Sequence, residues 1–190
     1  MALHSAIREG RPSTTRMHNP TDHPWISGNL RIRAEVIAQV DAEARAAYAR
    51  DEECCGLLLG PRQDALLVDA IQPFKNRANE LHRIDAAQYP RTGRTSFDID
   101  PLRVQRMVSE GESTGRPVKV LYHSHVDVDA YFSETDAAAA TMAGEGPTYD
   151  FAYLVTSCKA GVVHDRKLFV WDPDRQTFVE SSHSVVGGPA

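Results

Sequence analysis

Hydrophobic residues recur along the chain with two different spacings, and these predict an alternation of helices and strands. Between Ala34 and Tyr48 the apolar residues lie three and four positions apart, which is typical of an amphipathic helix. Elsewhere, short apolar runs bounded by glycine, proline and polar residues indicate strands. The predicted strands span residues 29–32, 54–59, 66–71, 118–122, 151–157, 162–171 and 177–179.

Two further helices are predicted from the residues that start them. Asp100 and Pro101 place a proline at the first helical position, where its missing N–H is not needed, and this helix is expected to run to about Glu112. The alanine-rich segment 133–142 has high helix propensity. The resulting order of elements predicts an α/β fold, a single domain with a central mixed β-sheet flanked by helices.

Three polar segments show no such periodicity. Residues 1–28 are rich in proline, serine and threonine, and we predict a disordered N-terminal tail. Residues 181–190 are predicted to be a flexible C-terminal tail, which leaves 29–180 as the folded domain. Residues 75–95 are polar and irregular, and a loop of that length in a compact domain is usually functional or mobile.

Candidate chemistry lies in and after the predicted strand 118–122. His123 and His125 follow that strand, and side chains two apart on a strand project from the same face. Ser133 and Asp136 are three apart and share the first turn of the next predicted helix. Two imidazoles and one carboxylate are three of the four ligands of a catalytic zinc ion, which keeps its fourth position for water.

Each half of this pattern also has a simpler interpretation. Ser-x-x-Asp before an apolar run is a capping box, and a lone His-x-His pair is more often structural or incidental. The two halves in this order, one on a strand and one on a helix, favour a metal site. A general base is also needed, and two glutamates, Glu52 and Glu53, stand just before the predicted strand 54–59. On that segment alone, a solvated turn is the simpler explanation.

Together these residues resemble the JAMM (MPN-plus) zinc peptidases, most closely the short prokaryotic members. The positions that carry the resemblance are Glu53-x-Cys55-Gly56, His123-x-His125 and, seven residues later, Ser133-x-x-Asp136. Residues 76–78, 97–101 and 152–155 also look related, and the resemblance covers roughly residues 30–180. One departure is Val126, where many prokaryotic members have proline.

The resemblance implies roles for individual residues. His123, His125 and Asp136 would bind one zinc ion per chain (Zn2+), and Glu53 would be the acid/base acting on the zinc-bound water. Ser133 would help to stabilise the oxyanion of the tetrahedral intermediate. Glu53 is preferred because the family places one residue between the acid and Cys-Gly, and Glu52 stays open as the alternative. The family fold is the JAMM/cytidine-deaminase-like layer architecture.

The resemblance also implies a substrate class. Family members hydrolyse the bond after the C-terminal Gly-Gly of a ubiquitin-like or sulfur-carrier protein. The substrate could be a sulfur carrier that loses its C-terminal amino acid or a ubiquitin-like modifier released from a lysine, and the small size mildly favours the first. Two other functions stay open, a non-catalytic MPN-type binding scaffold and a metal hydrolase of a small molecule.

Composition narrows the partners. The formal net charge of −5 over 190 residues argues against nucleic acid as the main partner. There is no stretch of about 18 consecutive apolar residues, so no membrane span is expected. Three cysteines, two of them adjacent, do not suggest a disulfide framework, and the N-terminus lacks the apolar core of a secretory signal. We therefore expect a cytoplasmic protein.

Overall fold

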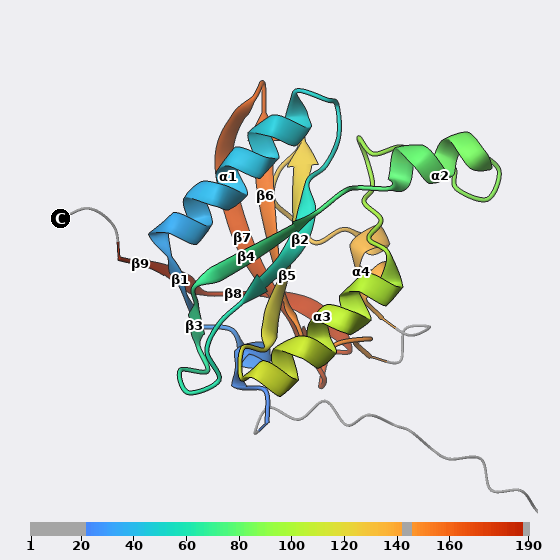
Figure 1. Ribbon diagram of the computed structural model, residues 1–190. Helices are drawn as coiled ribbons and strands as arrows, with labels where there is room; N and C mark the ends of the chain where they lie inside the picture. Colours follow the sequence, from blue (N-terminus) through green and yellow to red (C-terminus); the bar gives the residue numbers. More distant parts are fainter. Residues whose placement is uncertain (1–21, 142–145, 188–190) are drawn as a thin grey trace, which may run out of the picture.

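The computed structural model describes residues 22–141 and 146–187, whose strands form two sheets (Figure 1). The strands of the large sheet, in spatial order, are β4 (Ala70–Phe74), β2 (Cys55–Leu59), β5 (Val118–Val126), β6 (Ala152–Lys159), β7 (Val162–Asp172) and β8 (Thr177–Ser181). The small sheet consists of β3 (Leu67–Val68), β1 (Leu30–Arg33) and β9 (His183–Val186). In the large sheet β5 and β6 are parallel and the other pairs are antiparallel, so the predicted mixed sheet is confirmed.

Helices cover both faces of the large sheet, as the α/β prediction requires. Helix α1 (Ala34–Tyr48) packs its buried residues into a core with Leu58 of β2. Helices α3 (Pro101–Thr114) and α4 (Glu134–Ala140) contribute to a second core, which contains Leu57. Successive strand residues thus supply opposite cores, and each fully buried leucine stabilises the fold by about 1.5–3 kcal/mol.

The N-terminal boundary of the folded domain lies earlier than predicted. A short 3-10 helix, η1 (Pro24–Ser27), places Trp25 in the core on the α1 side, with 2% of its surface exposed. The Trp25 indole also donates a hydrogen bond of 2.7 Å to the Asp150 carbonyl. Residues 22–28 are therefore part of the domain, whereas the rest of the predicted N-terminal tail lies outside the described residues.

The C-terminal boundary also differs from the prediction. Residues 183–186 form β9, which pairs in parallel with β1, so they are not a flexible tail. The strand is only four residues long and mostly exposed or half-buried, so it lacks the apolar run that marks the other strands. Its stability depends on a partner about 150 residues away in sequence.

Two internal segments differ from the prediction: residues 75–95 contain a helix, and residues 66–71 form two strands instead of one. The polar stretch 75–95 contains a helix, α2 (Ala78–Ile84), which buries only Ala78 and extends away from the sheets (Figure 1). The predicted strand 66–71 is divided at Asp69, because β3 pairs with β1 and β4 pairs with β2.

None of the helices in the described part of the chain has the length and hydrophobicity needed to span a bilayer.

Candidate metal centre

Strand β5 carries both candidate histidines on the face that α3 and α4 cover. The strand was predicted to span residues 118–122 with the histidines at its end, but it continues to Val126, so His123 and His125 lie within it. Both are almost fully buried, with 0% and 4% of their surfaces exposed. Ser124 points the opposite way, where its Oγ accepts a hydrogen bond of 2.8 Å from the Cys54 amide. The predicted alternation along this strand is therefore confirmed.

Helix α4 presents Asp136 to the histidines through its N-terminal cap. Ser133 is the N-cap, its Oγ accepts from the Asp136 amide at 3.1 Å, and its own amide donates to Asp136 Oδ2 at 2.9 Å. The Ser133 hydroxyl also lies 2.6 Å from Asp136 Oδ2. The capping box and the ligand interpretation are thus compatible, because the cap occupies Oδ2 and fixes the carboxylate while Oδ1 faces His123.

The three side chains converge with the spacing that a metal ion requires. His123 Nε2 lies 3.2 Å from His125 Nε2 and 3.4 Å from Asp136 Oδ1, and His125 Nε2 lies 3.6 Å from Asp136 Oδ2. Corners of a tetrahedron with bonds of about 2.0–2.1 Å are separated by about 3.3–3.4 Å, close to the distances from His123 Nε2 to His125 Nε2 and to Asp136 Oδ1, so this spacing suits a zinc-sized ion. Within the described residues, this trio is the one group of at least three such side chains close enough to share an ion.

Protonation of the trio also suits metal binding. His125 Nδ1 lies 2.9 Å from the Asp129 carbonyl, which requires an N–H there and leaves a lone pair on Nε2. Burial lowers the pKa of His123, which favours its neutral, metal-binding form. Burial opposes ionisation of Asp136, but the nearby His123 and His125 rings and the hydrogen bond from the Ser133 hydroxyl outweigh it and hold the pKa of Asp136 below its ordinary value.

Glu53 lies next to this trio because of the pairing of β2 with β5. Cys55 is opposite His123 in that antiparallel register, so continuing the register by two residues places Glu53 opposite His125. Glu53 is 6% exposed. Burial, with a further contribution from the Asp136 charge, raises the pKa of Glu53 from 4.5 to about 9. A carboxyl group with this pKa is mostly protonated at neutral pH, and a cation held by the trio would lower the pKa and favour the carboxylate.

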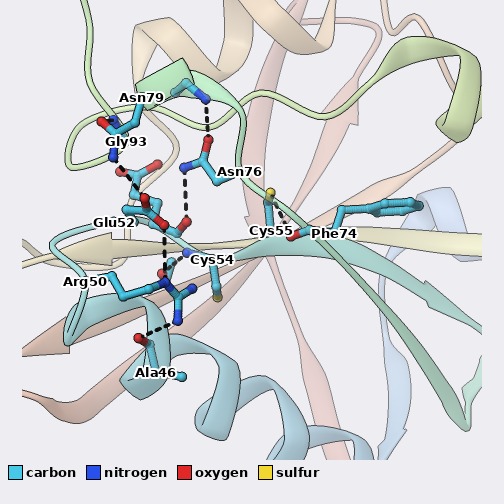
Figure 2. Close-up of polar contacts among 12 residues, drawn as sticks. Ala46, Arg50, Glu52, Cys54, Cys55, Phe74, Asn76, Asn79 and Gly93 are labelled. Atoms are coloured by element: carbon cyan, nitrogen blue, oxygen red, sulfur yellow. Dashed lines mark hydrogen bonds and ion pairs between the residues drawn. The ribbon is translucent and has the colours of Figure 1, made fainter. Parts of the chain in front are cut away.

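Glu52, the alternative acid, is occupied elsewhere. Its Oε1 accepts a hydrogen bond of 2.9 Å from Asn79 Nδ2, and its Oε2 lies 3.4 Å from Arg50 Nε (Figure 2). Asn79 in turn accepts from the Gly93 amide at 2.8 Å. Glu52 therefore links Asn79 of helix α2, and through it Gly93, to Arg50 just after α1. Glu53 is the glutamate that lines the cleft beside the trio.

Asn76 was not among the predicted site residues, yet it holds Glu53 in position. Its buried side chain donates to the Glu53 carbonyl at 3.1 Å and to the Ser96 carbonyl at 3.0 Å. Its Oδ1 accepts from the amides of Ala78 and Asp98 at 2.9 and 3.1 Å. The polar segment after β4 is thus the support of the candidate base.

A cleft and a cavity both border the trio. A cleft of about 390 Å3 is lined by Glu53, His125, Ser133 and Asp136 together with residues of the 91–95 segment. A second cavity, of about 290 Å3 and mostly apolar, reaches His123 and Asp136 from the side of α3. The trio is therefore buried, with a cavity on each of two sides.

Comparison with known families agrees with this geometry. The model of the family described as prokaryotic homologs of the JAB domain matches residues 33–171. The chain belongs to this family. The match includes every residue of the trio, Glu53 and Ser133, so the resemblance predicted from the motif is confirmed at the level of the family.

Individual relatives extend the comparison. The chain is 31% identical over 114 residues to proteins named CysO-cysteine peptidase from Mycobacterium tuberculosis and Mycobacterium bovis. The alignment covers 59% of this chain and 66% of those proteins, slightly less than two thirds of their length. Solution structures of proteins from Desulfitobacterium hafniense and Salinibacter ruber superpose with TM-scores of 0.58 and 0.53 at 20% and 26% identity. They cover 84% and 83% of this chain and 94% and 92% of their own chains.

Proposed function

We propose that this protein is a zinc-dependent peptidase that hydrolyses the bond after the C-terminal Gly-Gly of a sulfur-carrier or ubiquitin-like protein. The observation that carries the proposal is the convergence of two imidazole nitrogens, 3.2 Å apart, and the Asp136 carboxylate, 3.4 and 3.6 Å from them, beside a buried glutamate. His123, His125 and Asp136 would hold the ion. When bound, zinc would lower the pKa of a coordinated water to about neutral and polarise the scissile carbonyl.

Glu53 would carry out the proton transfers, and Ser133 would stabilise the oxyanion. Glu53, held beside the trio and lining the same cleft, would as a carboxylate accept a proton from the attacking water and then deliver it to the leaving amine. The Ser133 hydroxyl would turn from Asp136, 2.6 Å away, toward the developing oxyanion. The Ser133 amide, which also donates to Asp136, would keep that carboxylate in place during this rotation.

A sulfur carrier is the favoured substrate within this class. The relatives that are 31% identical are named for the peptidase of CysO-cysteine, a name that points to cleavage of a terminal cysteine. The substrate to test is therefore a sulfur-carrier protein ending in Gly-Gly-Cys, called the Gly-Gly-Cys carrier below. A glycine pair has no side chains, so an extended tail could approach the buried trio through the cleft.

The experiment measures zinc content by plasma mass spectrometry and cleavage of the Gly-Gly-Cys carrier by mass spectrometry. Wild type should hold about one zinc ion per chain and release cysteine. His125→Ala should lose both, whereas His164→Ala, which changes an exposed histidine on β7, should keep both. Glu53→Gln should keep zinc and lose cleavage by about 10²–10⁴-fold.

The outcomes separate the competing functions. A wild-type protein that takes up no zinc even when the ion is supplied would refute the metal centre and leave the binding scaffold. Zinc binding without cleavage of the carrier would favour a metal hydrolase of another substrate. Equal cleavage by Glu53→Gln with zinc retained would refute the role given to Glu53.

A further inference from the structure

Arg91 lines the cleft of the candidate centre with a guanidinium that forms no ion pair within 4.0 Å among the described residues, although its charge acts on Glu53 and lowers the pKa of that carboxyl group. It shares the cleft with Glu53 and Asp136, and its side chain is exposed. Arg91 Nη1 makes a long hydrogen bond of 3.5 Å to the Thr95 carbonyl. A guanidinium in this state presents most of its N–H donors to whatever enters the cleft.

The neighbouring Arg94 differs in this respect. It lines the same cleft, but it pairs with Asp51 and, at 2.8 Å, with Asp127. Its charge is therefore already balanced within the protein. Of the two arginines that line this cleft, Arg91 is the one available to an incoming anion.

The chemistry proposed for Glu53 fixes which part of the substrate lies near it. A group that protonates the leaving amine must come within about 2.6–3.2 Å of that nitrogen. When the leaving group is an α-amino acid, its carboxylate is only two bonds from the same nitrogen. That carboxylate would therefore enter the Glu53 cleft, where the carboxylates of Glu134 and Asp136 would repel it unless a cation stood nearby.

We infer that Arg91 binds the free α-carboxylate of the C-terminal residue that is removed, and so makes the protein a carboxy-terminal processing peptidase. This inference rests on the proposed function. Guanidinium and carboxylate pair through two parallel hydrogen bonds, which would orient the leaving residue as well as attract it. A lysine side chain released from an isopeptide has no charge near the reacting nitrogen, and would gain nothing from Arg91.

The test compares the Gly-Gly-Cys carrier with the same protein ending in a C-terminal carboxamide. The measured quantity is the ratio of kcat/KM for the acid to kcat/KM for the amide. Wild type should show a ratio of about 10–100, the range expected for one charge-assisted pair. Arg91→Gln should bring the ratio close to one, and Arg91→Lys should restore part of it.

The ratio is independent of the fraction of correctly folded enzyme, because both substrates meet the same preparation. Arg83→Gln, which changes an exposed arginine on α2 outside the cleft, is the matched control and should keep the wild-type ratio. An unchanged ratio in Arg91→Gln would overturn the inference while leaving the peptidase proposal intact. Failure of wild type to cleave either form would remove the proposed function and the inference with it.

Discussion

Replacing Asn76 by alanine should destabilise the fold more than any other substitution of a polar loop residue near the centre. The Asn76 amide has two N–H donors and an oxygen with two lone pairs, and all four are used. The donors reach the carbonyls of Glu53 and Ser96, and the oxygen accepts from the amides of Ala78 and Asp98. One side chain therefore joins the start of β2, the 96–98 segment and the start of α2.

The magnitude follows from the number of groups that lose a partner. Asn76 is 8% exposed, so water does not readily replace it. At about 1 kcal/mol for each hydrogen bond, alanine should lower the free energy of unfolding by about 4 kcal/mol. That is a large part of the 5–15 kcal/mol typical of a domain, and the Glu53 carbonyl would lose one of its restraints.

Urea unfolding followed by far-ultraviolet circular dichroism measures this loss. Asn79→Ala is the matched control, because Asn79 is only half-buried and bonds the Glu52 carboxylate and the Gly93 amide, of which the partly exposed carboxylate can turn to water. The control should cost about 1 kcal/mol. A loss below about 1 kcal/mol for Asn76→Ala, or equal losses for the two variants, would refute the view that Asn76 holds this region together.

Three further predictions concern protonation, the helix cap and the N-terminal segment. With metal removed by a chelator, the folded state keeps the Glu53 proton up to a pKa of about 9, whereas the unfolded state loses it near 4.5. Stability should therefore fall as pH rises between these values, and wild type should lose about 3 kcal/mol relative to Glu53→Gln between pH 5 and pH 7.5, as measured by urea unfolding. A pH-independent difference would contradict the burial argument. Ser133→Ala should cost about 1 kcal/mol of stability through the lost cap and should lower kcat for the Gly-Gly-Cys carrier by about 10²-fold with zinc retained. Wild-type kcat in that variant would limit Ser133 to the cap. Trp25→Ala should lower the free energy of unfolding by about 3–5 kcal/mol, because the side chain is 2% exposed, and an unaffected melting temperature would show that residues 22–28 are dispensable.

The elements that the sequence predicted well are those stabilised by their own pattern. Helix α1 has the predicted bounds, Ala34–Tyr48, because its apolar stripe is complete within one segment. The start of α3 at Pro101 was also predicted correctly. The Asp100 side chain caps this helix by accepting a hydrogen bond from the Leu102 amide. In both helices the information that fixes the structure is local.

The elements that were missed depend on distant contacts. Strand β9 pairs with β1 from the far end of the chain, and α2 buries a single residue, so neither shows a periodic apolar pattern. The supporting role of Asn76 could not be predicted either, because its hydrogen-bond partners lie as far away in sequence as Glu53 and Asp98. A single asparagine in a polar stretch does not reveal that its amide will be saturated by four backbone groups.

The choice between the two glutamates shows that more could have been predicted from strand parity. Leu57 packs in the core on the α3 side and Leu58 in the core on the α1 side. Counting back in steps of two from Leu57 places Cys55 and then Glu53 on the face that also carries the histidines, and puts Glu52 on the other. The alternation of β2 therefore selects Glu53 on physical grounds alone, provided that β2 and β5 are known to be neighbours. Only that pairing, a contact between segments about 70 residues apart, had to come from the structure.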